Sequence, residues 1–506
     1  MKLIDDFLNR ITMYKLMLYG LGALAAVAVL FGLTGTLQLD GFGLLMSASI
    51  LLLVCYGANY VLAKMYGATI NVESSLITAL ILFCIFSPPK SVSQAAILAL
   101  TGVIAMASKY VLAIRKRHIF NPAAIAAVAV GALGLTYASW WIANDVMLPF
   151  VLLLGVLIVR KIRRAYMFVA FFLIAAAAVV LTRLGDGYAF TTLVTDTVVT
   201  WPLLFLGTVM LTEPLTTPPT RKLQIVYALM VGLLVGLGSR LHIGSVYMTP
   251  ELALVLGNVF AYSTLLKKRL SLRFTAEQEI GQDIYEFRFM PDSPFTYKPG
   301  QYADVTLPVA KPDVHGNRRT FTIASSPTEK EVLFGIKFSN PPSSFKAALG
   351  RLRPGSYLYG SQVAGDFTLP GDPKVKVVFI AGGIGITPFR SMLKYLIDTK
   401  ETRDIILFHQ IMEPTQMVYK NVLGEAEGIG LKLVYVLTKD KKDVPADWRG
   451  EVGFIAKEML VRQVPDYTER TFYVSGPPAM VKNYTALLRS MGIQRSRIVI
   501  DYFSGY

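Results

Sequence analysis

The chain has 506 residues, of which 53% are apolar and only 17% are charged. Its mean hydropathy of +0.49 is too high for a soluble protein of this size, so a membrane protein is indicated. The net charge of +16 would also suit a nucleic-acid-binding protein. In the first half, however, the basic residues cluster in short loops between apolar runs, which is typical of cytoplasmic loops. We therefore expect no nucleic-acid partner.

The N-terminal stretch MKLIDDFLNRITMYK contains Asp5 and Asp6 and leads to no small-residue cleavage site, which predicts an amphipathic helix rather than a signal peptide. Apolar segments of membrane-spanning character follow, because about twenty apolar residues cross a bilayer core. We predict a multi-span α-helical membrane domain of about ten helices in residues 1–268, with the lipid bilayer as its partner. The predicted spans are 16–33, 44–64, 75–88, 93–114, 121–141, 146–160, 165–182, 198–212, 223–239 and 250–266.

The charges of the loops predict the orientation of these spans. With a cytoplasmic N-terminus, the opposite side receives only Lys90, Arg183 and Arg240, and residues 267–269 return the chain to the cytoplasm. The basic residues then predicted to be cytoplasmic are Lys64, Lys109, Arg115, Lys116, Arg117, Arg160, Lys161, Arg163, Arg164, Arg221 and Lys222. The predicted localisation is the cell (inner) membrane, with multiple passes and both termini cytoplasmic.

Cysteine and histidine usage argues against metal cofactors. The two cysteines, Cys55 and Cys84, lie in apolar runs, whereas an iron–sulfur cluster usually needs about four thiolates. Membrane reductases that carry haem ligate it through paired histidines within spans, and no such pair is found in this sequence. We expect no metal site and predict that all four histidines are surface or loop residues: His118, His242, His315 and His409.

Two segments, 109–124 and 210–222, interrupt the apolar pattern with proline and polar residues at membrane depth. Irregular backbone there is tolerated where it is buried or lines a cavity, so these breaks indicate a site. The segments resemble NqrB of the sodium-pumping NADH:quinone oxidoreductase (Nqr) and RnfD of the Rnf electron-transport complex. The stretch His-Ile-Phe-Asn-Pro-Ala-Ala and the Thr-Glu-Pro turn carry the likeness, with Glu213 in place of an aspartate.

That resemblance implies flavin in the membrane domain, including an FMN esterified to the threonine of a Ser-Gly-Ala-Thr motif. The corresponding loop here runs from Asp186 to Thr192, and Thr192 is the aligned threonine. Because Ala189 and Phe190 replace the serine and glycine, we expect an outer loop without covalent FMN. Non-covalent FMN or another flavin in the membrane domain stays open.

From Leu270 the pattern changes to short alternating strands, and then to strands alternating with helices from about residue 374. We predict an antiparallel β-barrel FAD domain in 269–372 and an α/β nucleotide-binding domain in 373–506. The motifs resemble those of the ferredoxin–NADP reductase superfamily, in the same order along the chain. They are PGQY (299–302), RTFT (319–322), PPSSF (341–345), GDF (365–367), AGGIGITP (381–388) and VSGPPAM (474–480).

The resemblance assigns the flavin contacts. It implies that Arg319 pairs with the FAD pyrophosphate, which suits the guanidinium fork, and that Phe321 stacks on the isoalloxazine ring. The Thr322 hydroxyl is expected near flavin N5, where hydride arrives, and Tyr302 is expected at the flavin as well. The next predicted helix, Phe345–Leu352, is expected to bind phosphate at its N-terminus, through the two residues Ser343 and Ser344.

The apolar run from Val375 to Ile380 predicts a buried parallel strand, directly followed by the glycine-rich turn. Glycines let a backbone approach pyrophosphate closely, and Pro388 suits the first turn of a helix. We therefore predict the phosphate site of the nicotinamide nucleotide at Gly382, Gly383, Gly385 and Thr387. After the next predicted strand, Ile405 to Phe408, come His409, Gln410 and Glu413 without an adjacent basic residue, which favours NADH over NADPH.

The VSGPPAM segment corresponds to the superfamily's Cys-Gly-Pro segment beside the nicotinamide, with Ser475 in place of cysteine. The resemblance implies that Ser475, Gly476 and Pro477 border the nicotinamide. The aromatic residues Phe503 and Tyr506 at the end of the chain either cover the flavin ring or anchor the last strand.

Together these patterns predict an NAD(P)H-dependent flavin oxidoreductase in which FAD accepts hydride from NADH, held close by the protein. The electrons would then pass to a flavin in the membrane domain and to an acceptor on or beyond the outer face. The alternatives are an NADH:quinone reductase on the inner side and an electron-flow-coupled ion pump. Carboxylates for an ion path are Glu213, Asp186 and Asp196, although all lie at predicted span ends, where solvated carboxylates are common.

Overall fold

The computed structural model describes residues 8, 11–68, 71–114, 117–184, 186–244, 246–264, 270–309, 313, 316–438 and 444–502. Most of the predicted N-terminal helix, Arg115, Lys116, residues 267–269, His315, Phe503 and Tyr506 lie outside these residues. The chain divides into two compact units, Met1–Lys268 and Arg269–Tyr506, which we call unit 1 and unit 2. Each unit is described by itself.

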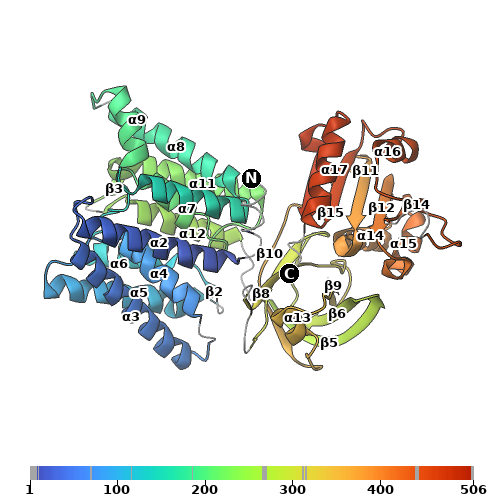
Figure 1. The fold of residues 1–506 in the computed structure, drawn as a ribbon, viewed down its shortest axis with the longest axis horizontal. Helices are drawn as coiled ribbons and strands as arrows, with labels where there is room; N and C mark the ends of the chain where they lie inside the picture. Colours follow the sequence, from blue (N-terminus) through green and yellow to red (C-terminus); the bar gives the residue numbers. More distant parts are fainter. Residues whose placement is uncertain are drawn as a thin grey trace. The chain divides into compact units, whose positions relative to one another are not determined.

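Unit 1 is built from helices (Figure 1). Their bounds are α2 (Met13–Leu33), α3 (Gly41–Met65), α4 (Val72–Ile85), α5 (Val92–Val111), α6 (Pro122–Ala132), α7 (Leu148–Ile162), α8 (Ala165–Leu184), α9 (Phe190–Val199), α10 (Leu203–Phe205), the π-helical turn η1 (Leu206–Met210), α11 (Arg221–Leu237) and α12 (Pro250–Thr264). Two short hairpins, β1–β2 (Ala113–Ile114 and Arg117–His118) and β3–β4 (His242–Ile243 and Val246–Tyr247), complete the described part.

Each predicted span range contains a helix, but the lengths differ from the prediction. Among the described residues, four helices are long and apolar enough to cross a membrane: α2, α3, α5 and α8. A fifth span results if α9 and the segment Leu203–Met210, bent by 48°, count as one. The predicted number of about ten spans is therefore not confirmed, because several of the apolar segments form helices shorter than a bilayer core requires.

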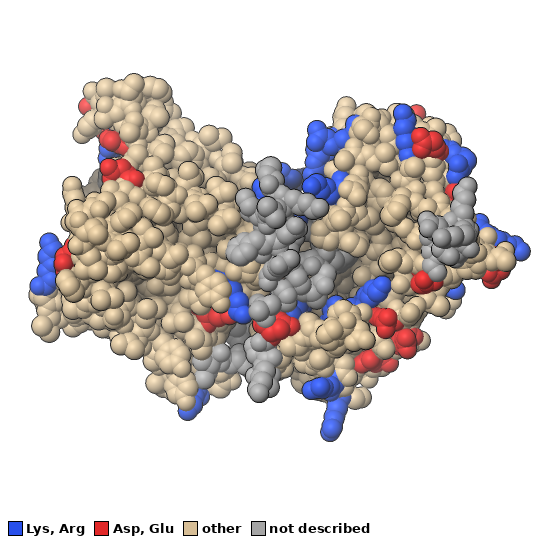
Figure 2. All heavy atoms as spheres, viewed as in Figure 1, with Lys and Arg blue, Asp and Glu red and all other residues tan. Residues whose placement is uncertain are grey.

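The surface of unit 1 suits an apolar surrounding. Large aliphatic side chains project outward from the long helices, such as Leu53 on α3 and Leu181 on α8. Figure 2 shows few charged side chains on the visible face of unit 1, whereas they are spread over unit 2. Inside, Gly232 and Gly236 let α11 approach α8 closely: a Cβ at Gly236 would lie 2.6 Å from the Ala175 carbonyl oxygen. Small residues that let two helices approach in this way are typical of membrane helix pairs.

Unit 2 begins with an antiparallel sheet in the order β8-β7-β10-β5-β6-β9. A backbone hydrogen bond of 2.8 Å from Ala324 N to Leu333 O joins the two ends of this order, and the sheet thereby curves toward closure. The strands are β5 (Leu270–Gly281), β6 (Ile284–Pro291), β7 (Tyr302–Thr306), β8 (Arg318–Thr322), β9 (Val332–Lys337) and β10 (Tyr357–Ala364), with the short helix α13 (Ser344–Leu349) between β9 and β10.

The second part of unit 2 is a parallel sheet in the order β14-β13-β12-β11-β15-β16. Its alternating side chains form two cores: Ile380 and Phe408 face α16 and α17, while Phe379 and Leu407 face α14 and α15. The elements are β11 (Val377–Gly382), α14 (Thr387–Thr399), β12 (Ile405–Ile411), α15 (Lys420–Glu427), β13 (Leu431–Leu437), β14 (Glu451–Val452), α16 (Lys457–Gln463), β15 (Thr471–Gly476), α17 (Pro478–Ser490) and β16 (Ile498–Tyr502). The α/β fold expected from the sequence is present.

Candidate functional site

The strand β8 carries the expected flavin motif. Alternation along the strand places Arg319 and Phe321 on one face, where both contact Phe345 of α13. Thr322 is buried and lies opposite Tyr302 in the β7–β8 register. The structure therefore brings together the aromatic ring, the guanidinium and the helix that the resemblance assigned to FAD.

The buried Arg319 belongs to a cluster of charged residues. Its Nη1 donates to the carbonyls of Gly316 and Arg318 at 3.0 and 2.8 Å. Lys346 lies near it, and burial lowers the pKa of this lysine, with the positive charge of Arg319 lowering it further. Two cations held together in this way favour an anionic ligand.

A carboxylate shows that this cluster binds anionic oxygens. Asp313 accepts a hydrogen bond of 2.9 Å from the backbone N–H of Ser344 and one of 3.4 Å from Arg319 Nη2. Ser343 is the N-cap of α13 and accepts from Lys346 N at 3.3 Å, as predicted, although the helix ends at Leu349 rather than Leu352. The donors therefore fit the diphosphate of FAD.

The glycine-rich turn η3 (Gly383–Ile386) connects β11 to α14. Gly383 has a φ of +53°, a conformation that favours glycine. A Cβ at Gly385 would lie 2.4 Å from the Ser475 carbonyl oxygen, so only glycine lets the turn approach β15 this closely. The first turn of α14 begins with Thr387 and Pro388, as the sequence predicts. The Thr387 N–H donates to the Ile384 carbonyl, so η3 and α14 form one continuous helical run, and the N-terminal end of this run suits a phosphate.

His409 corrects two predictions. The strand β12 extends through His409 to Ile411, and this histidine is fully buried rather than exposed or in a loop. Its Nε2 donates to the Gly383 carbonyl oxygen at 3.2 Å, because a carbonyl can only accept. Burial lowers its pKa to about 4, so the ring is neutral near pH 7 and supports the phosphate turn. A single histidine after an apolar run gives no sequence signal of this role.

The end of β15 brings Ser475 and Gly476 beside the glycine-rich turn, with Pro477 exposed after them. The Ser475 Oγ is buried and has no hydrogen-bond partner among the described residues. A buried hydroxyl of this kind is suited to a ligand that completes its hydrogen bonding.

Asp501 is a further polar residue at this place, which the sequence reasoning missed. It lies opposite Ser475 in the parallel register of β15 and β16, and removal from water raises the pKa of its carboxyl to about 6. The sequence did contain a signal for this residue: an aspartate that interrupts an apolar run, with Ile498–Ile500 before it and Tyr502 after it.

Replacing Asp501 with asparagine tests this environment. The carboxyl pKa of about 6 lies above its ordinary value of 3.8, so native stability is lost as pH rises between these values. The asparagine side chain does not titrate. We therefore expect the difference in melting temperature, Asp501→Asn minus native protein, to increase from pH 4 to pH 7 when both are measured in detergent. A difference in melting temperature that is the same at both pH values would contradict this environment.

In unit 1, the segment after Asp186 is not the predicted loop throughout. Helix α9 begins at Phe190, so Thr192 is an exposed residue of its first turn. Asp186 forms a half-exposed ion pair of 2.5 Å with Arg240. A helix begins here because Thr, Leu and Val continue the apolar periodicity past the motif.

The two irregular segments of unit 1 meet at a cavity. It has about 570 Å³ of space free of protein atoms, partly open to the surroundings. The cavity is lined by residues of α2, α4, α5 and α6 and by the turn after η1, including Lys109, Asn121 and Glu213. Glu213 thus faces a cavity between helices, which corrects its reading as a solvated carboxylate at a span end.

Residues 379–485 match the oxidoreductase NAD-binding domain. The glycine betaine monooxygenase reductase subunit of Chromohalobacter salexigens is 30% identical over 222 residues, covering 42% of this chain and 58% of that protein. A flavohemoprotein of Bacillus cereus is 28% identical and covers 41% of this chain and 53% of that protein. The chain thus spans a little over half the length of these relatives. A flavohemoglobin structure from Malassezia yamatoensis, with bound FAD and heme, has a TM-score of 0.44 at 20% identity, covering 61% of this chain and 74% of that chain.

The domain match falls on the parallel sheet and its glycine-rich turn. Unit 2 is therefore a ferredoxin–NADP reductase-like module for FAD and NAD(P)H, the module of an NAD(P)H-dependent flavin oxidoreductase. When bound, FAD supplies a two-electron acceptor for the hydride of the nicotinamide. Residues of the chain would orient the two cofactors and hold their phosphates.

Proposed function

We propose that the protein is a membrane-bound, NADH-dependent flavoprotein that passes electrons through FAD to a second flavin in unit 1. From there the electrons go to an acceptor on or beyond the outer face. The FAD and NAD(P)H module of unit 2 and the apolar helices of unit 1 support this combination. The resemblance of segments 109–124 and 210–222 to NqrB and RnfD supports the second flavin.

The cavity of unit 1 is the observation that carries this proposal. Lys109 Nζ donates to the carbonyl and the hydroxyl of Ser74, both at 3.1 Å. Glu213 accepts from Asn121 Nδ2 at 2.9 Å and from Thr216 Oγ1 at 3.4 Å. Each charged group is held by its own neighbours while it lines the same cavity. Charged groups between membrane helices are costly and mark functional sites.

The polar groups that line the cavity suit a ring with hydrogen-bonding edges. Lys109 supplies a donor and Glu213 an acceptor, which is the combination that the pyrimidine edge of a flavin uses. Attachment through Thr192 is not part of the proposal, because Ala189 and Phe190 replace the motif residues.

In unit 2, we propose that Arg319, Ser343 and Ser344 hold the FAD diphosphate, and that Thr322 and Ser475 border the hydride path. NADH is the proposed donor, since Met412 and Glu413 follow β12 in place of a basic residue. A multi-pass arrangement in the cell (inner) membrane with cytoplasmic termini would give unit 2 access to NADH.

Flavin extraction tests the proposal. We expect acid extracts of the detergent-purified protein to contain FAD and a second flavin. Lys109→Met should lower the second flavin about tenfold or more and leave FAD unchanged, because a hydrogen bond to a charged group contributes about 1.5–3 kcal/mol. The matched control is Lys90→Met, since Lys90 is exposed. The proposal fails if the native protein holds FAD alone.

The alternatives predict other outcomes of the same preparation. An NADH:quinone reductase would contain FAD alone and would reduce a short-chain quinone without access to outer-face acceptors. An ion pump would show sodium uptake into vesicles that tracks NADH oxidation. In that case the cavity carboxylate Glu213 is the candidate for the ion path, rather than Asp186, which is paired with Arg240.

A further inference from the structure

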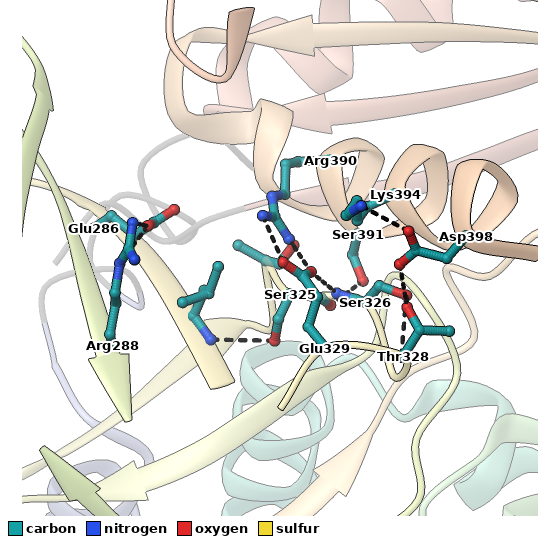
Figure 3. Close-up of polar contacts among 12 residues, drawn as sticks. Glu286, Arg288, Ser325, Ser326, Thr328, Glu329, Arg390, Ser391, Lys394 and Asp398 are labelled. Carbon is teal, nitrogen blue, oxygen red and sulfur yellow. Dashed lines mark hydrogen bonds and ion pairs between the residues drawn. The ribbon is translucent and has the colours of Figure 1, made fainter. Parts of the chain in front are cut away.

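A polar cluster joins the two parts of unit 2 (Figure 3). One side is the segment that follows the flavin strand β8, and the other side is the helix α14 that follows the phosphate turn. We call this cluster the clamp. It consists of Ala324, Ser325, Thr328 and Glu329 on the flavin side, and Arg390, Ser391, Lys394 and Asp398 on α14.

Arg390 and Glu329 form the centre of the clamp. The guanidinium donates to both carboxylate oxygens, with 2.9 Å from Nη2 to Oε1 and a short contact from Nη1 to Oε2. Arg390 Nη1 also donates to the Ala324 carbonyl at 3.1 Å. Glu329 in turn accepts from the backbone N–H of Ser326 at 2.6 Å. A bidentate ion pair of this kind fixes the relative orientation of the two side chains as well as the distance between them.

Further contacts extend the clamp along α14. Ser391 Oγ donates to the Ser325 carbonyl at 2.5 Å. Lys394 lies one turn after Ser391, and Asp398 lies one turn after Lys394. The Lys394 ammonium donates to the Asp398 carboxylate at 2.6 Å, and the Thr328 hydroxyl donates to the same carboxylate at 2.5 Å. These helix positions are spaced by three or four residues, so they share the face of α14 that meets the flavin side. The helix is thereby held at several points along its length.

The antiparallel sheet and the nucleotide-binding part of unit 2 also pack directly against each other beside the glycine-rich turn η3. A Cβ on Gly335 of β9 would lie 2.8 Å from Thr387 Cγ2, 3.2 Å from Ile384 Cδ1 and 2.5 Å from the Tyr419 hydroxyl. The glycine thus lets the turn and the flavin sheet come into direct contact. Any tilt of α14 would move the bound nucleotide relative to the flavin strand.

We propose that the clamp sets the distance and angle between the nicotinamide and the flavin, with Arg390 and Glu329 as positioning residues. Arg390 lies one turn beyond Thr387 at the phosphate end of α14. Arg390 donates to the Ala324 carbonyl and Ser391 to the Ser325 carbonyl, and this backbone begins two residues after Thr322 of the flavin motif. The inference requires only hydride transfer within unit 2 and is independent of a second flavin in unit 1.

The test compares two arginines in the full-length protein. Arg390→Lys keeps the charge but loses the two-pronged geometry. The matched control is Arg470→Lys: Arg470 donates to both oxygens of Asp404 at 2.7 and 2.9 Å, and both residues belong to the nucleotide-binding part. The side chains are similarly buried, with 8% and 6% exposed. Both variants lose a similar pair, but only the first pair spans the two parts.

The readout is the rate of flavin reduction per bound FAD at saturating NADH, in rapid-mixing experiments with NADH and with NADH deuterated at the transferred position. We expect Arg390→Lys to slow this rate about tenfold to a hundredfold, since misplacement by about 1 Å can cost about 10²-fold. The deuterium isotope effect on this rate should reach the value expected when hydride transfer limits the rate. The affinity for NADH and the FAD content should be unchanged. Arg470→Lys should lower only the melting temperature.

Glu329→Gln provides a second variant if Arg390→Lys does not fold, because it keeps the shape and the acceptor of the side chain. It should slow hydride transfer in the same direction by a smaller factor. An unchanged rate per bound FAD in a folded variant would overturn the proposal, and so would equal slowing by Arg470→Lys.

Discussion

Arg319→Gln will purify with little or no FAD, while Arg318→Gln will retain it. Arg319 lies buried on the face of β8 that carries Phe321 and contacts Phe345 of α13, beside Lys346 and the N-terminus of that helix. Each charge-assisted hydrogen bond to a phosphate is worth about 1.5–3 kcal/mol. The loss of two such bonds would weaken FAD binding by about 10²–10⁴-fold. Flavin absorbance per polypeptide, before and after addition of FAD, measures the effect.

Arg318 is the matched control because it is the adjacent arginine on the opposite face of the same strand. It forms an ion pair of 2.8 Å with Asp304 of β7. This pair is partly exposed and its removal should cost about 1 kcal/mol or less. If both variants lost FAD equally, the flavin site would not lie on the Arg319 face.

Gly385→Val will abolish reduction by NADH while FAD stays bound. The added Cβ would lie 2.4 Å from the carbonyl oxygen and 2.7 Å from the carbonyl carbon of Ser475, neither of which can move without breaking β15. The turn would therefore be pushed from the phosphate position and the nicotinamide from the flavin. Rates of flavin reduction should fall at least about 10²-fold, since misplacement by about 1 Å has this effect.

Gly424→Ala in α15 serves as the control, because a Cβ there meets no atom within 4 Å. Alanine in a helix should be neutral or slightly stabilising. FAD fluorescence and absorbance should match the native protein in both variants. Normal reduction of Gly385→Val by NADH would show that the nucleotide binds elsewhere.

The nucleotide-binding fold was predictable because its signals are local. An apolar run followed by glycines and a Thr-Pro pair predicted β11, its turn and α14, with a boundary error of two residues for the strand. Parallel strands buried on both faces read as continuous apolar runs, which makes this pattern easy to detect. By contrast, His409 reads as the end of such a run, and only the three-dimensional contact with Gly383 shows its role.

The candidate spans were harder to delimit, because hydropathy does not show where a helix stops. The predicted span 121–141 is helical only as α6, which ends at Ala132. Just beyond this end, Gly134 adopts a φ of +67° and the Leu135 N–H donates to the Val130 carbonyl at 3.0 Å. This is a glycine-terminated helix end. The apolar residues that follow then pack as irregular chain, with Trp141 donating to the Phe83 carbonyl at 2.7 Å.

Contacts between distant segments were not predictable at all. Asn121 and Glu213 are 92 residues apart, and Arg390 and Glu329 are 61 apart. The sequence marked both segments of the first pair as unusual because proline and polar residues interrupt apolar runs. It gave no signal for the clamp, since single charged residues in a soluble domain are common on its surface.

Anaerobic mixing of the full-length, detergent-purified protein with NADH tests the central claim most directly. The account predicts a yellow protein whose flavin absorbance bleaches within the mixing experiment, with NADH oxidised in proportion to the FAD present. A colourless protein that does not take up FAD, or a flavin that stays oxidised in excess NADH, would contradict it.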